Sequence, residues 1–189
     1  MNSAAAFEVL DFWFGAPGSP QFGKSRAEWF RKSDEFDTLI RGRFLRLYEQ
    51  AADGQLASWR DSPITLLALI IMLDQFPRNL FRDSAQAFAT DAMALDCAKR
   101  MTALQWDGRL NQVERSFVYL PFEHAEDIDA QRICLRLFGE LGRTDLLEWA
   151  QKHYVIIERF GRFPHRNAVL GRDSTPEEME FLKQPGSRF

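Results

Sequence analysis

Apolar residues recur at three- and four-residue steps along almost the whole chain, which is the spacing of one face of an α-helix. Phe36, Ile40 and Phe44 follow this spacing after Ser33, a residue type that commonly caps the N-terminus of a helix. Residues 155–157 are β-branched, but they continue a helical pattern. Because we find no convincing pair of strands, the sequence predicts an all-α fold.

The most apolar segment, residues 64–75, is expected to form a central helix. Ser62 followed by Pro63 is typical of an N-cap and a first helical residue. The segment is apolar on nearly every side, which favours burial in the middle of the core. Its longest apolar run is too short to span a bilayer. Pro77 is expected to end this helix.

The other helices are placed by the same periodicity and by capping residues. They are expected to begin near Ser84, Asn111, Ile128 and Thr144, with a short last helix at a capping box formed by Thr175 and Glu178. Short connections between successive helices indicate antiparallel neighbours. The steps between successive pairs are unequal, so we expect antiparallel helical hairpins in an irregular array. A chain of 189 residues is expected to form a single domain over residues 1–189.

Charge and cysteine content exclude several classes of protein. The net charge of -3 gives no overall basic surface, which argues against a nucleic-acid-binding protein. Cys97 and Cys134 have no metal or redox spacing and fit two reduced thiols in a cytoplasmic protein. Residues 1–14 contain no Lys or Arg, so they do not resemble a signal peptide. We therefore expect a cytoplasmic protein without a membrane or nucleic-acid partner.

A first unusual segment, DQFPRNLFR, follows the central helix and begins with Asp74. A carboxylate at the C-terminal end of a buried helix opposes the helix dipole and requires a cationic partner. Arg78 and Arg82 could provide it, as could the more distant Arg162 and Arg166. The segment is interpreted either as an ion-paired contact between helices or as part of a ligand site.

A second segment, PFEHAED, begins at Pro121, which is expected to kink or end the preceding helix. Glu123, Glu126 and Asp127 would then place negative charge at the start of the next helix, where the dipole favours it. That interpretation leaves His124 unexplained. A histidine beside apolar residues is commonly a hydrogen-bonded core residue, but the adjacent carboxylate leaves a role in proton transfer open.

A third segment carries the strongest indication of an anion site. Arg159, Arg162 and Arg166 are spaced at three and four residues, so a helix would place them on one face. Three like charges on one face repel one another unless an acidic side chain or a bound anion pairs with them. Pro164 is expected to end the helix, which would place Arg166 and Asn167 in the following turn.

No cofactor or metal is expected. The histidines are His124, His153 and His165, and they lack the spacing of a zinc-binding helix. The neighbouring arginines would also oppose a cation. The sequence contains neither a glycine-rich phosphate loop nor a GxSxG nucleophile motif.

Together these segments resemble a family known as domain of unknown function 924, found mainly in bacteria. The resemblance lies in DQFPRN from Asp74, PFEH from Pro121 and FGRFPHRN from Phe160, and VLDFWFG from Val9 looks like the family's opening. It covers nearly the whole chain and implies a tetratricopeptide-like all-helical fold. The family has no established activity and so supplies no catalytic residues. Ala125 replaces the serine usual after the histidine of the second motif, which excludes a hydroxyl nucleophile there.

Three functions are consistent with these observations. The protein could bind a protein or peptide partner on a concave helical surface, or bind a small anionic ligand, and we favour such binding. It could be a hydrolase or transferase for a phosphate or carboxylate substrate. Alternatively, the motifs are purely structural. The candidate ligand-binding residues are Arg78, Asn79, Arg162, Arg166 and Asn167. The candidate catalytic residues are Asp74, Glu123, His124 and His165.

Overall fold

The computed structural model describes residues 3–188, and within this range the chain is helical and contains no strand. The prediction of an all-α fold is therefore confirmed. The chain divides into two compact units, each described by itself below. The first comprises Met1–Arg82 and Gln86–Pro121, and the second comprises Asp83–Ala85 and Phe122–Phe189. The single domain and the tetratricopeptide-like arrangement stay predictions.

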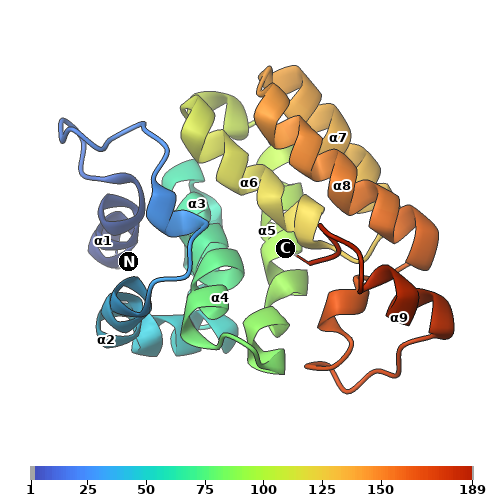
Figure 1. The fold of residues 1–189 in the computed structure, drawn as a ribbon. Coiled ribbons are helices and arrows are strands. Elements are labelled where there is room, and N and C mark those ends of the chain that lie inside the picture. Colours follow the sequence, from blue (N-terminus) through green and yellow to red (C-terminus); the bar gives the residue numbers. More distant parts are fainter. Residues whose placement is uncertain (1–2, 189) are drawn as a thin grey trace. The chain divides into compact units, whose positions relative to one another are not determined.

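The first unit packs its helices around the segment that was expected to be central. Its elements are α1 (Ser3–Phe14), α2 (Asp34–Ala52), α3 (Pro63–Ile70), a π-helical turn (Ile71–Gln75), α4 (Phe76–Leu80), α5 (Asp91–Ala103) and α6 (Gln112–His124) as far as Pro121. Helix α3 contacts α1 and α5, and α4 contacts α2 (Figure 1). Residues 66–76 are all buried, so this segment forms the centre of the unit.

The central helix continues through Pro77, so the prediction that it ends there is wrong. The π-helical turn leads directly into α4, where Pro77 lies in the first turn and its missing N–H is tolerated. In an α-helix, the carbonyl of Leu73 would accept a hydrogen bond from residue 77. Here the Thr90 hydroxyl donates to that carbonyl at 2.6 Å. A side chain from outside the helix therefore replaces the donor that proline lacks.

The helix starts expected after Ser33 and Ser62 are confirmed. The side chains of Ser33 and Ser62 accept hydrogen bonds from backbone N–H groups in the first turns of α2 and α3. The start expected near Ser84 is wrong, because Ala85–Phe88 forms a separate 3₁₀ turn and α5 begins at Asp91. No capping side chain marks that boundary.

The second unit contains a helical hairpin followed by a loop-rich segment. Its elements are the last turn of α6, α7 (Ile128–Leu141), α8 (Thr144–Phe160), a 3₁₀ turn (Pro164–Arg166) and α9 (Pro176–Phe181). Helices α7 and α8 lie side by side, as expected from the short connection at Gly142 (Figure 1). Thr144 is the first residue of α8 rather than its N-cap. Pro121 lies inside α6, which continues to His124.

None of the helices within residues 3–188 is both long enough and apolar enough to cross a membrane.

We expect Thr90→Val to destabilise the protein, because it leaves the buried carbonyl of Leu73 without this donor. Such a loss costs about 1 to 3 kcal/mol in the free energy of unfolding, measurable by urea denaturation. Thr102→Val is the matched control, since its hydroxyl bonds only carbonyls of its own helix, those of Ala98 and Lys99. The control should change stability by less than about 0.5 kcal/mol. Equal effects of the two variants would contradict this role of Thr90.

Candidate functional site

The first motif places Arg78 between two carboxylates of the first unit. Asp74 is fully buried, and its Oδ1 lies 3.5 Å from Arg78 Nη1. Arg78 Nη1 and Nη2 donate to the two carboxylate oxygens of Asp91 at 3.0 and 3.2 Å. Gln75 donates to the Asp74 carboxylate, and Arg78 also donates to the Asp74 carbonyl. Burial lowers the pKa of Arg78, but the two carboxylates outweigh it, so the pKa is raised.

The same motif binds a carboxylate that was not predicted, Asp37 in the first turn of α2. Asn79 Nδ2 donates to Asp37 Oδ1 at 2.7 Å, and Arg82 donates to both oxygens, with Nη2 to Oδ1 at 2.8 Å. Burial raises the pKa of Asp37, but the hydrogen bonds from Arg82 and Asn79 outweigh it, so the pKa is lowered. The motif therefore ties α4 to both α2 and α5.

The helix of the third segment ends before Pro164, so the prediction of its end is wrong, and the three arginines do not share a helix face. Helix α8 ends at Phe160 because Gly161 adopts a left-handed conformation, with φ of 67°. Arg162 therefore follows the helix, and Arg166 lies in the following turn as expected. Each arginine bonds a different group: Arg159 bonds Glu177, Arg162 bonds Glu178, and Arg166 donates to the carbonyl of His124.

Glu178 is the buried centre of the hydrogen-bond network in the second unit. Its carboxylate accepts from Arg162 Nε at 2.6 Å and Nη2 at 2.8 Å, from the Thr175 N–H at 2.7 Å and from Asn167 Nδ2 at 3.3 Å. The hydrogen bonds from Arg162 contribute most to lowering the pKa of Glu178, to about 2. The predicted capping box is confirmed, whereas the pairing with Arg162 was not predicted.

Glu126 forms a second ion pair close to this network. Arg172 donates to both of its carboxylate oxygens, at 2.6 and 2.9 Å, and the Phe163 N–H donates to Oε1 at 2.7 Å. Glu126 therefore binds the turn after α8. Asp127 caps the start of α7 as expected. Glu123 was also expected at the start of that helix, but it lies in the last turn of α6.

Several candidate residues of the second unit gather around the ring of Phe163. The ring centroids of His153 and His165 lie 5.5 and 5.7 Å from its centroid, and the Arg166 guanidinium carbon lies 4.4 Å from it. His124 lies next to His153, with ring centroids 6.4 Å apart. The structure thus brings His124, His165 and Arg166 together with His153, which was not a candidate.

Burial sets the charge state of this histidine cluster. It lowers the pKa of His153 to about 3 and that of His165 to about 4, so both rings are neutral near pH 7. His153 Nδ1 lies 2.9 Å from the Trp149 carbonyl and 3.5 Å from Glu123 Oε1. An imidazole with so low a pKa accepts a proton only weakly, so neither ring is an efficient general base at neutral pH.

The predicted site residues thus form two groups. The first unit holds Asp74, Arg78 and Asn79. The second unit holds Glu123, His124, Arg162, His165, Arg166 and Asn167. Within the described chain, no group of three or more His, Cys, Asp or Glu side chains is arranged to hold a metal ion.

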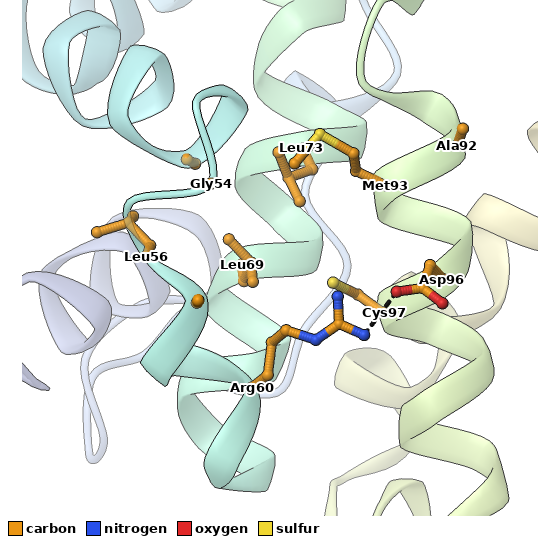
Figure 2. Close-up of a pocket in the computed structure, with 11 residues that line it drawn as sticks. Gly54, Leu56, Arg60, Leu69, Leu73, Ala92, Met93, Asp96 and Cys97 are labelled. Atoms are coloured by element: carbon orange, nitrogen blue, oxygen red, sulfur yellow. Dashed lines mark hydrogen bonds and ion pairs between the residues drawn. The ribbon is translucent and has the colours of Figure 1, made fainter.

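A pocket in the first unit was not predicted from the sequence (Figure 2). It has a volume of about 300 Å³ and lies between the segment after α2, α3 and α5. Leu69, Leu73 and Met93 contribute to its apolar wall, and Arg60 and Asp96 form an ion pair of 2.5 Å. Burial raises the pKa of the lining Cys97 thiol to about 11, so it is protonated at neutral pH. Its residues come from separate elements and share no local sequence pattern.

The comparisons with known proteins agree with this all-helical architecture. The family described as "Bacterial protein of unknown function (DUF924)" matches residues 9–186, and the chain belongs to this family. The chain is also similar to a protein of unknown function from Agrobacterium tumefaciens with a solved structure. The two share 40% sequence identity and a TM-score of 0.87, over 97% of this chain and 99% of the other. No curated protein matches the chain.

We expect Arg162→Gln to destabilise the protein, because it leaves the buried carboxylate of Glu178 without its main donor. Hydrogen bonds to a charged group contribute about 1.5 to 3 kcal/mol, so urea denaturation should show a loss of this size. Arg159→Gln is the matched control, since Arg159 and Glu177 form an exposed pair worth at most about 1 kcal/mol. A loss no larger than that of the control would contradict a structural role for Arg162.

Acid should destabilise the protein through His153. An unfolded histidine binds a proton below about pH 6.5, whereas His153 in the folded protein does so only near pH 3. Stability should therefore fall as the pH drops through this interval. Between about pH 7 and about pH 5, His153→Phe should lose roughly 1 to 2 kcal/mol less than the wild type. Urea denaturation at both pH values tests this, and identical losses would argue against a neutral buried His153.

Proposed function

We propose that the protein binds a small ligand in the pocket of its first unit, while the residues of the sequence motifs hold each unit folded. The observation that carries the proposal is the pocket's composition: an apolar wall with one ion pair, Arg60 and Asp96 (Figure 2). Small-molecule sites are mostly apolar, with a few polar groups that orient the ligand. The volume of about 300 Å³ lies at the lower end of their usual range.

The contacts of the motif arginines support the structural part of the proposal. Arg78 donates to both oxygens of Asp91, and Arg172 donates to both oxygens of Glu126. A ligand anion at either position would have to displace a carboxylate of the protein. Each carboxylate already accepts two parallel hydrogen bonds from its arginine, so such exchange is unfavourable. A pocket of this size also suits a small molecule better than a protein or peptide partner, whose contact surface is larger.

A hydrolase or transferase acting on an anionic substrate is a second candidate. The observation in its favour is that His165 and Arg166 lie against the ring of Phe163, which also contacts His153, the neighbour of His124. We place it second because Arg162, which was expected to hold the anion, donates to Glu178. The low pKa of His165 also makes it a weak base at neutral pH.

Binding can be tested with 1-octanol as an apolar probe and methionine methyl groups as NMR reporters. Titration should shift the methyl resonance of Met93, which lines the pocket, and leave that of the exposed Met179 unchanged. Ala57→Phe, which adds volume at a lining position, should weaken binding about tenfold or more. Ser58→Phe is the matched control, because it adds the same ring at the next residue, outside the lining. An unchanged Met93 resonance at saturating probe would contradict the proposal.

A further inference from the structure

The pocket has a charged mouth and an apolar floor. The Asp96 side chain is 62% exposed and that of Arg60 36%, whereas Leu73 and Cys97 are each 1% exposed. A ligand that fills this space must therefore place apolar atoms inside and can place a polar group near solvent. The pocket accordingly fits an amphipathic molecule better than a uniformly apolar one.

The charges near the mouth favour an anionic polar group. Arg60 and Asp96 are the charged residues that line the pocket, and they offset each other. Arg100 adds a further positive charge, since its Nε donates to the backbone carbonyl of Arg60 at 3.0 Å. Two guanidinium groups thus lie close to one carboxylate, which leaves an excess positive charge at this end of the pocket.

Building on the proposed function, we infer that the pocket binds a small amphipathic carboxylate, with its head group on Arg60 and its hydrocarbon body against Leu69, Leu73 and Met93. The guanidinium of Arg60 carries five N–H donors in a planar fork, which matches a carboxylate. Its ion pair with Asp96 uses Nη2. The exposed Asp96 carboxylate therefore competes with the ligand's head group for Arg60.

Octanoate and 1-octanol test this inference, because they share an alkyl chain and differ in the head group. Dissociation constants from the Met93 methyl shift should show octanoate binding about tenfold more tightly to the wild type. Arg60→Gln should abolish this preference, so that the two probes bind with similar affinities. Arg136→Gln is the control, since Arg136 lies in an exposed ion pair on α7, and it should leave both affinities unchanged.

Asp96→Asn provides a gain-of-function test that a misfolded variant could not pass. Removing the competing negative charge should strengthen octanoate binding several-fold relative to octanol binding. Equal affinities of the wild type for the two probes would overturn the inference and leave the proposed function standing. A preference for octanoate that persists in Arg60→Gln would also overturn it. Failure of both probes to shift Met93 would overturn the proposed function as well.

Discussion

The buried carboxylate of Asp74 imposes a constraint on the whole first unit. A charge in a helical core is costly unless it is paired and hydrogen-bonded, and Arg78 and Gln75 meet that requirement. The π-helical turn and Pro77 lie in the same stretch, where the carbonyl of Leu73 lacks its usual donor. Thr90 donates to this carbonyl, and the next residue, Asp91, binds Arg78. Residues at the start of α5 thus provide both the donor for the Leu73 carbonyl and a carboxylate for Arg78. These two interactions connect α5 to the central helix at this point.

The second unit also contains a buried carboxylate, that of Glu178, which is paired with an arginine from the turn after α8. Gly161 ends α8, and the following residues direct Arg162 to Glu178, which also completes the capping box of α9. Asn167 donates to Glu178 and accepts from Arg172, which joins this network to the ion pair with Glu126. The two Phe-Pro motifs therefore resemble each other in role: in each, Arg and Asn side chains bind carboxylates from other parts of the same unit.

Local signals were predictable from the sequence, whereas tertiary partners were not. The caps at Ser33 and Ser62 and the box of Thr175 and Glu178 depend on residues within one helical turn, so their patterns are readable. The partners of the first motif's arginines, Asp91 and Asp37, are ordinary acidic residues without a distinctive context. The continuation of the helix through Pro77 depends on a hydroxyl from Thr90, which no local pattern reveals. The pocket depends on side chains from several elements and was missed for the same reason.

The exposure of each ion pair decides which arginine is suited to a ligand. Taking Glu178 from Arg162 or Asp74 from Arg78 would leave a buried carboxylate without its cation, which is strongly destabilising. The pair of Arg60 and Asp96 is exposed, and such pairs contribute at most about 1 kcal/mol. A ligand carboxylate can therefore replace Asp96 at little cost, since the displaced side chain is solvated at once. By this comparison, the arginines most prominent in the sequence are the least available to a ligand, and Arg60, which belongs to no motif, is the most available.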